Sequence, residues 1–379
     1  MSEWKECTLG EVLILKRGYD LPHSEMKEGN IPVAGSNGII GNHNVATDIE
    51  PCITVGRSGS AGSTFYYNKA WAHNTTLYID DFRGNSPKYL YYLLLSLPLK
   101  KMAGGSAVPS LNRNHIHPLL IKFPTSLETQ HRIASILSSL DDKIAVNRRI
   151  CENLEAQAQA LFKHWFIDFA PFKNGKFVES ELGMIPEGWK VGKLSDLGDI
   201  ICGKTPSKAN KLYYGGNVPF IKIPDMHGNM FVINSEDNLS NEGSNSQLNK
   251  LIPEFSIMVS CIATVGLVSM NTKPSHTNQQ INTIVPYVPS YRYYIYENLK
   301  LREKELLLLG SSGTTTYNVN TKTFSSLKIL MPDLKVIEDF DKSIKYHFEE
   351  TLNLYQENLR LSTLRDTLLP KLMSGQIKV

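Results

Sequence analysis

The chain has 379 residues, of which 41% are hydrophobic and 20% charged, and 40 Lys and Arg against 37 Asp and Glu give it a formal charge of +3. This length indicates two or three globular domains, and the composition excludes a largely disordered protein. No apolar run approaches the ~18 residues of a membrane-spanning helix, and five scattered cysteines favour a soluble protein of a reducing, cytoplasmic compartment.

The first segment, residues 1–125, is predicted to be a globular domain of short strands interrupted by Gly, Asn and Pro. Its stretch 82–127 contains no Asp or Glu but does contain Lys100, Lys101 and Arg113. Such acid-free stretches are typical of a surface that neutralises DNA phosphates. Ordinary strands and loops that happen to lack acids explain the charge pattern equally well.

A long helix is predicted over residues 126–170. The sequence 125–128 (TSLE) has the form of a capping box, and the preceding Pro124 ends the first domain. Apolar residues then recur in alternating steps of four and three, the 3.5-residue period of a coiled-coil seam, in which we expect the polar Asn147 to fix the register. The predicted seam consists of Ile133, Leu137, Leu140, Ile144, Asn147, Cys151, Leu154, Ala158, Leu161 and Trp165.

Residues 171–332 are predicted to form a second globular domain, again with short strands and with an acid-free, lysine-containing stretch at 200–224. Gly198 to Thr205 literally matches the P-loop pattern that binds nucleotide phosphates. A P-loop needs a strand, a glycine-rich turn and then a helix, whereas Pro206 follows here and no amphipathic helix is predicted. A P-loop nucleotide-binding enzyme is therefore kept only as an alternative.

A second long helix is predicted within residues 333–379 and is expected to end near Pro370. At a rise of about 1.5 Å per residue each helix would extend roughly 55–65 Å. We expect the two helices to pack on each other as an antiparallel coiled coil, the alternative being two amphipathic helices on separate domains. The predicted seam of the second helix consists of Ile337, Phe340, Ile344, Phe348, Leu352, Tyr355 and Leu359.

The two halves of the chain are related by an internal repeat. Residues 53–62 match residues 257–266, and Asn-Arg-Asn at 112–114 matches Asn-Val-Asn at 318–320. A globular segment followed by a long helix therefore occurs twice. The fold class is predicted to be α+β, with two similar domains separated by two long helices that form an antiparallel coiled coil.

Motifs of catalytic and metal sites are missing from the sequence. There is no Asn/Asp-Pro-Pro-aromatic motif of amino-methyltransferases, no His-Glu-x-x-His, no cluster of Cys and His, and no Gly-x-Ser-x-Gly. His73, His115, His117 and His276 have no obvious partners and are interpreted as surface or core residues. The chain is therefore predicted to be non-catalytic and to hold no metal.

Three segments of the sequence resemble the specificity subunit of type I restriction–modification systems. Residues 161–169 (LFKHWFIDF) resemble the end of that family's central helix, 180–189 (SELGMIPEGW) the start of its second recognition domain, and 368–377 (LLPKLMSGQI) its C-terminal end. The resemblance implies two target recognition domains that each read one half of a bipartite double-stranded DNA target. It also implies that the helices set the spacer and dock partner subunits.

The resemblance further implies that the chemistry lies on other chains. The implied partners are two modification subunits, which methylate adenine with S-adenosylmethionine, and two restriction subunits, which use ATP and Mg to translocate and cleave DNA. No cofactor and no membrane are expected for this chain. A DNA-independent coiled-coil scaffold for protein interactions is the other alternative.

Candidate DNA contacts are chosen by residue type, because no motif identifies them. Basic residues of the acid-free stretches are expected to contact phosphates: Lys100, Lys101, Arg113, Lys204, Lys208 and Lys211. Loop residues expected to contact base edges are Arg57, Ser58, Asn74, Thr75, Asn112, Asn278, Gln279, Thr315 and Asn318.

Overall fold

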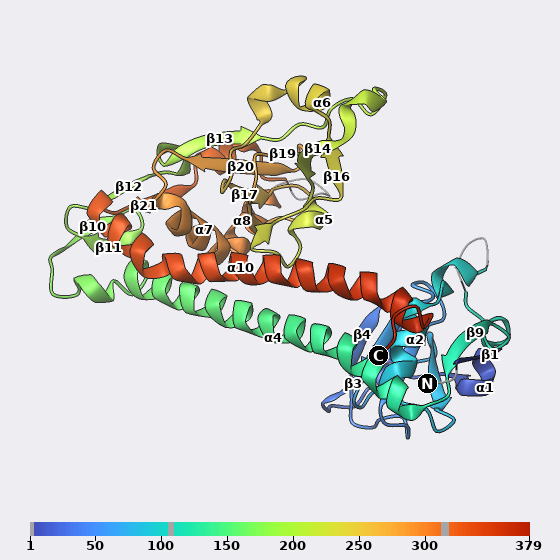
Figure 1. The fold of residues 1–379 in the computed structure, drawn as a ribbon. Helices are drawn as coiled ribbons and strands as arrows, with labels where there is room; N and C mark the ends of the chain where they lie inside the picture. Colours follow the sequence, from blue (N-terminus) through green and yellow to red (C-terminus); the bar gives the residue numbers. More distant parts are fainter. Residues whose placement is uncertain (1–3, 105–109, 312–317) are drawn as a thin grey trace. The chain divides into compact units, whose positions relative to one another are not determined.

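The chain folds into two compact units in the computed structural model, which describes residues 4–104, 110–311 and 318–379 (Figure 1). The first unit consists of Met1–Ala145 together with Leu359–Val379, and the second consists of Val146–Asn358. Each unit contains one globular region of short strands and helices and a section of both long helices. The predicted α+β class is confirmed.

The first globular region covers residues 4–124. Its strands are β1 (Trp4–Thr8), β2 (Ile14–Arg17), β3 (Ile31–Gly35), β4 (Gly38–His43), β5 (Cys52–Gly56), β6 (Thr64–Tyr67), β7 (Trp71–Ala72), β8 (Thr76–Asp81) and β9 (Leu120–Pro124). Its α-helices are α1 (Leu9–Val12), α2 (Pro87–Ser96) and α3 (Arg113–Ile116). The sheets have the orders β2-β8-β5-β6, β4-β3-β7 and β1-β9, and β5 is buried along its whole length because strands flank it on both sides.

The second globular region covers residues 170–331. Its strands are β10 (Phe177–Ser180), β11 (Gly183–Pro186), β12 (Lys190–Lys193), β13 (Gly198–Cys202), β14 (Tyr214–Ile221), β15 (Phe231–Val232), β16 (Asp237–Leu239), β17 (Ile257–Ser260), β18 (Val268–Asn271), β19 (His276–Thr277), β20 (Ile281–Pro286) and β21 (Lys328–Met331). Its α-helices are α5 (Ile223–Met226), α6 (Asn241–Asn245), α7 (Tyr291–Leu301), α8 (Glu303–Gly310) and α9 (Thr321–Ser325).

The two regions share one topology, which confirms the predicted internal repeat. The sheet β13-β20-β17-β18-β15 reproduces β2-β8-β5-β6 and adds one strand at its edge. The sheet β16-β14-β19 reproduces β4-β3-β7, including a short parallel pair, and β12-β21 reproduces β1-β9. The hairpin β10-β11 has no counterpart among the described residues of the first region.

The two long helices are α4 (Leu127–Phe166) and α10 (Leu334–Met373), each of 40 residues and therefore about 60 Å long. In the second unit they lie side by side and antiparallel, since Asn147 of α4 contacts Glu357 of α10 while the later Gln157 contacts the earlier His347. No helix among residues 4–104, 110–311 and 318–379 is long and apolar enough to cross a membrane.

Helix α10 continues past Pro370, where the sequence led us to expect its end. Leu372 and Met373 are buried in the core of the first globular region. The burial of these two side chains compensates for the backbone hydrogen bond that the proline nitrogen cannot donate, so the helix continues for about one more turn.

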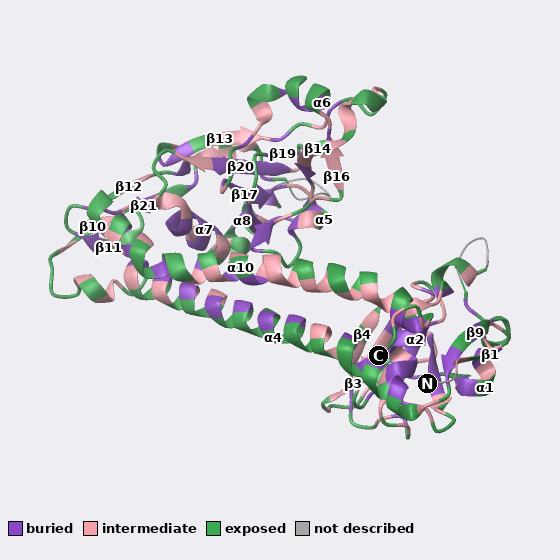
Figure 2. Cartoon of the chain, in the orientation of Figure 1, coloured by how far each residue is buried: buried purple, intermediate pink, exposed green. Residues whose placement is uncertain are grey.

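The apolar stripes of the long helices pack on the globular regions as well as on each other (Figure 2). In the first unit, Ile133 and Leu137 of α4 belong to the core of the first region. In the second unit, Ile344 and Phe348 of α10 belong to the core of the second region. Each helix therefore buries part of its stripe against a globular region, which the coiled-coil prediction did not foresee.

Asn147 lies in the section where α4 and α10 contact each other directly. There Leu154 of α4 packs with Leu354 of α10 in a small cluster of its own. The buried Asn147 side chain donates from Nδ2 to Glu357 Oε2 at 2.7 Å and to Asn358 Oδ1 at 2.9 Å. Its polar bonds therefore join the two helices at one position.

The predicted seam residues differ in burial, and Leu359 is exposed. Leu359 is 40% exposed because it follows the buried Leu354 by five residues, which places it roughly 140° around the helix. It is therefore not a seam residue. Half-buried members are Leu140, Leu161, Trp165, Leu352 and Tyr355. Buried members are Ile133, Leu137, Ile144, Asn147, Cys151, Leu154, Ala158, Ile337, Phe340, Ile344 and Phe348.

Candidate nucleic-acid interface

Loops at the end of strand β5 bring together residues that are far apart in the sequence. We call them the first loop cluster, comprising residues 57–62, 73–76, 99–104 and 110–113. The backbone N–H of Arg57 donates to the Thr75 carbonyl at 2.8 Å, and the Arg57 carbonyl accepts from the Leu111 N–H at 2.7 Å. Ser58 forms a bridge with Ser110. Three predicted contact segments therefore meet at Arg57.

Gly62 joins the segment 99–104 to the same cluster. Its φ of +84° lies in the left-handed region that favours glycine, and its N–H donates to the Gly56 carbonyl at 2.8 Å. A Cβ at this position would lie 2.5 Å from the backbone nitrogen of Lys100. The missing side chain therefore lets Lys100 lie directly against the loop. The sequence match ended at this glycine, but its role was not predicted.

The first loop cluster carries cations without protein partners. In the part of the chain that is described, Arg57, Lys100, Lys101 and Arg113 form no side-chain hydrogen bond and no ion pair, and only Arg57 is half-buried rather than exposed. Four cations elsewhere in this region are paired: Lys16 with Asp80, Arg17 with Asp20, Lys69 with Glu50, and Arg83 with Asp81. The unpaired group gives the cluster a positive potential that suits phosphate groups.

A second loop cluster in the other unit repeats this arrangement; it comprises residues 261–266, 277–281 and 318–321. The N–H of Cys261 donates to the Gln280 carbonyl at 2.8 Å, and the Cys261 carbonyl accepts from the Val319 N–H at 2.8 Å. Gly266 donates to the Ser260 carbonyl at 3.0 Å, as Gly62 does to Gly56. Cys261 therefore occupies the backbone position of Arg57.

These hydrogen bonds correct one part of the sequence match. Because the N–H of Val319 replaces that of Leu111, Asn112 corresponds to Asn320 and not to Asn318. Asn112 and Asn320 each cap the short helix that follows, accepting a 2.9 Å hydrogen bond from a backbone N–H of its first turn. The shared N-cap pattern was the signal that would have identified Asn320.

Several predicted base contacts are engaged within the protein, Asn278 and Asn74 among them. Asn278 is buried; its Nδ2 donates to Gln280 Oε1 at 2.9 Å and its Oδ1 accepts from the Gln280 N–H at 3.1 Å. Contrary to the prediction, this side chain is buried and holds the loop in shape. Asn74 is half-buried and donates to Asp20.

The remaining candidates of the second region are distributed unevenly. Gln279 is exposed in the second loop cluster, where its Oε1 accepts a 2.6 Å hydrogen bond from the Thr205 hydroxyl. Lys204 adjoins it, because its N–H donates to the Thr277 carbonyl at 2.9 Å. Asn318 is exposed and bridges Ile262.

Two exposed lysines and one threonine complete the set. Lys208 and Lys211 lie in the connection before β14, and no contact among the described residues joins them to the second loop cluster. Thr315 lies outside the described residues.

The P-loop match is a strand and not a phosphate loop. Residues 198–202 pair with β20 along their whole length. Gly203 packs so closely that a Cβ would lie 2.2 Å from the Asn278 carbonyl oxygen, and the residues up to 210 form no helix. The segment therefore lacks the glycine-rich turn and the helix N-terminus that cradle a phosphate in a P-loop.

The histidines with assignable contacts have structural partners. His276 is buried beside Ser244, with Nε2 and Oγ 2.8 Å apart, and burial lowers the pKa of His276 to about 4. His117 Nε2 accepts from the Leu15 N–H at 3.0 Å, and burial lowers its pKa as well. No group of three or more His, Cys, Asp or Glu side chains in the described ranges could hold a metal ion.

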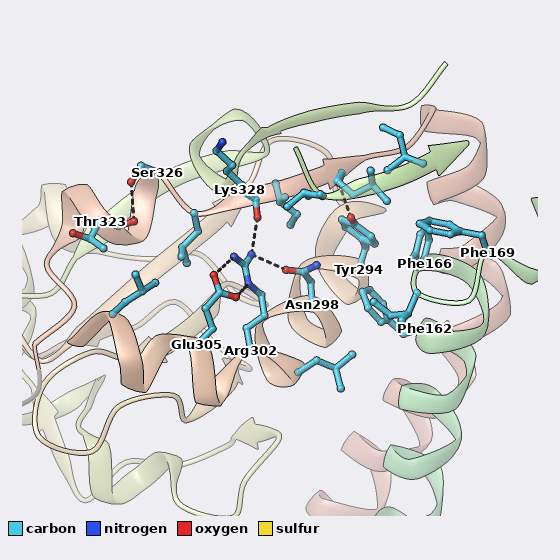
Figure 3. Close-up of a pocket in the computed structure, with 18 residues that line it drawn as sticks. Phe162, Phe166, Phe169, Tyr294, Asn298, Arg302, Glu305, Thr323, Ser326 and Lys328 are labelled. Atoms are coloured by element: carbon cyan, nitrogen blue, oxygen red, sulfur yellow. Dashed lines mark hydrogen bonds and ion pairs between the residues drawn. The ribbon is translucent and has the colours of Figure 1, made fainter. Parts of the chain in front are cut away.

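The second unit also contains a cavity of about 510 Å³, shown in Figure 3. It is lined mainly by apolar side chains such as Phe162, Phe166 and Tyr294, and it shares no lining residue with the second loop cluster. Its Arg302 is occupied by both carboxylate oxygens of Glu305, at 2.7 Å each. The cavity therefore lies outside the candidate interface.

Comparisons with known proteins agree with this arrangement. The family model described as type I restriction modification DNA specificity domain matches residues 1–156 and 186–352. The specificity subunit of type I restriction enzyme HindI from Haemophilus influenzae is 40% identical, over 77% of this chain and 77% of its own length. That of MjaIX from Methanocaldococcus jannaschii is 30% identical, over 79% and 72%.

A solved structure shares the fold. The S subunit of a type I restriction–modification system from M. genitalium superimposes with a TM-score of 0.63, covering 98% of this chain and 96% of that subunit at 17% identity. Neither a nucleotide-binding enzyme nor a DNA-independent scaffold finds support among these relatives.

Proposed function

The chain belongs to the family of type I restriction modification DNA specificity proteins, and we propose that each of its two globular regions reads one half of a bipartite DNA target. The observation that carries this proposal is the duplicated loop cluster. Both copies share their backbone hydrogen bonds, but Cys261 replaces Arg57. One backbone frame with different side chains is suited to reading two different short sequences.

The long helices are proposed to set the spacer and to dock the modification subunits. In the second unit, Val146 and Ile150 of α4 are 48% and 39% exposed. They are four residues apart and lie about 40° from each other around the helix, so they form one exposed apolar patch. An exposed apolar face on a long helix is the type of surface that a partner protein covers.

Catalysis is proposed to belong to the partner chains, in the cytoplasm where such a complex meets its DNA. Two modification subunits would bind S-adenosylmethionine, and two restriction subunits would bind ATP and Mg. The role of this chain would be to place the target before them. The family supports this division, because the curated relatives of the chain are specificity subunits.

Methylome sequencing tests the proposal. Deleting the gene should remove methylation at one bipartite motif, and complementation with the intact chain should restore it. Replacing residues 1–125 with those of another family member should change only one half of the motif. If a strain that expresses the partner subunits loses no motif on deletion, the proposal is wrong.

A further inference from the structure

We propose that Arg57 reads a guanine in the half-site of the first globular region, and that the second region reads its half-site without an arginine at this position. This inference rests on the proposed function and adds to it one specificity-determining residue. It predicts that the two half-sites differ in chemistry at one defined place.

The backbone of Arg57 is fixed from both sides. Its N–H is bound by Thr75 at 2.8 Å, its carbonyl is bound by Leu111 at 2.7 Å, and the next residue, Ser58, is bridged to Ser110. A side chain attached to such a fixed backbone loses less conformational freedom on binding than one on an open loop. A side chain held in this way is suited to discriminating between DNA bases, because that discrimination depends on the exact position of its donor groups.

The guanidinium of Arg57 lacks a counterpart in the protein. Residue Arg57 is half-buried, but its guanidinium has no hydrogen bond or ion pair with any described residue and its nitrogen atoms are not among the buried ones. Its five N–H groups therefore stay available to a ligand that supplies acceptors. The planar guanidinium presents parallel N–H groups, and guanine presents O6 and N7 as adjacent acceptors in the major groove.

The neighbouring cations favour a base over a phosphate as the partner of Arg57. Lys100, Lys101 and Arg113 belong to the same loop cluster and are exposed, so they are the side chains placed to reach the phosphate backbone. Arg57 is the only half-buried member of this group of four cations. Phosphate contacts position a protein on DNA, whereas contacts to base edges carry the sequence information.

The second loop cluster supplies the internal comparison. Cys261 has the same two backbone hydrogen bonds as Arg57, but it is 2% exposed and cannot offer a forked donor. The second loop cluster exposes the neutral Gln279, and the exposed Lys204 adjoins this cluster through its backbone bond to Thr277. The difference therefore lies in the side chain and not in the backbone that carries it.

The test uses the complex of the full chain with its modification subunits. Binding to duplexes that carry every single-base change in the target should show that Arg57→Ala loses about 5- to 150-fold in affinity for the cognate duplex. It should also lose preference at one guanine of one half-site, with the other half-site unchanged. Arg57→Lys keeps the charge but not the fork, and it should lose most of that preference too.

Arg113→Ala is the matched control. Removing this exposed cation should weaken binding to all duplexes alike and reduce the slope of log affinity against log salt by about one. The inference is overturned if Arg57→Ala behaves in this same way, if Arg57→Lys keeps full specificity, or if the half-site assigned by exchange of residues 1–125 contains no G·C pair. If the wild-type complex shows no sequence preference, the proposed function itself fails.

Discussion

The Asp141 carboxylate of α4 lies 2.7 Å from the Arg365 guanidinium of α10, and the same carboxylate accepts a 2.6 Å hydrogen bond from the Tyr92 hydroxyl of α2. All three residues belong to the first unit. One partly buried carboxylate therefore joins both long helices to the first globular region.

Asp141→Ala should reduce the free energy of unfolding by about 1–3 kcal/mol, because two donors that are partly removed from water lose their acceptor. Urea denaturation followed by circular dichroism measures this change. Asp339→Ala breaks only exposed pairs with Lys335 and Lys342 and should leave the free energy of unfolding nearly unchanged. Equal losses in the two variants would contradict the role assigned to Asp141.

Glu297 should make the stability of the second unit depend on pH. It is fully buried in α7, and neither carboxylate oxygen has a hydrogen-bond partner among the described residues. Burial raises the pKa of Glu297 from 4.5 to about 8; nearby Glu155 adds to the shift, and Lys300 opposes it. The native side chain therefore keeps its proton at neutral pH.

The sign of the effect follows from proton binding. Between pH 4.5 and about 8 the unfolded chain loses this proton and the folded chain retains it, so stability falls as pH rises, by up to about 1.4 kcal/mol per pH unit. Glu297→Gln should flatten this fall, as shown by urea denaturation at pH 5.5, 6.5 and 7.5. The exposed Glu338→Gln should keep the wild-type slope; parallel curves for all three proteins would refute the prediction.

Gly62→Ala should weaken DNA binding as well as stability. The left-handed φ of +84° and the 2.5 Å approach to Lys100 oppose a Cβ, so we expect a loss of more than about 1 kcal/mol in the free energy of unfolding. The displaced Lys100 should lower affinity for the target duplex. Gly84 provides the control: its φ is +74°, but a Cβ there would meet nothing within 4 Å, so Gly84→Ala should be strained and still bind DNA normally.

Matched heptad insertions should test the spacer role of the helices. Seven residues inserted between Asn147 and Cys151 of α4, together with seven between Leu354 and Glu357 of α10, add about 10 Å to each helix and preserve the pairing on either side. Methylome sequencing should then show an altered gap or no methylation, with both half-site sequences intact. A changed half-site with an unchanged gap would disprove the assignment.

The long helices and the repeat could be predicted from the sequence because both rest on local periodicity and on collinear identities. The end of α10 could not, since the burial of Leu372 and Met373 overrides the local effect of Pro370. The residues of the candidate site were harder to predict than the helices and the repeat. The environment of Arg57 depends on Thr75 and Leu111, which come together only in the folded chain.

Predictions of individual DNA-contact residues were wrong where one residue type can serve two purposes. An asparagine in a polar loop suits a base edge and also suits an internal bond, and the burial of Asn278 against Gln280 decides for the second. Residue type alone contains no information about that choice. The helix-capping role of Asn112 was hidden for the same reason.

The duplicated backbone of the two loop clusters makes each copy a design template for the other. Cys261 and Arg57 show that the same backbone frame carries a small buried thiol in one copy and a long half-buried cation in the other. An exchange of side chains between the copies would therefore keep the backbone hydrogen bonds of the frame and change the group that the frame presents.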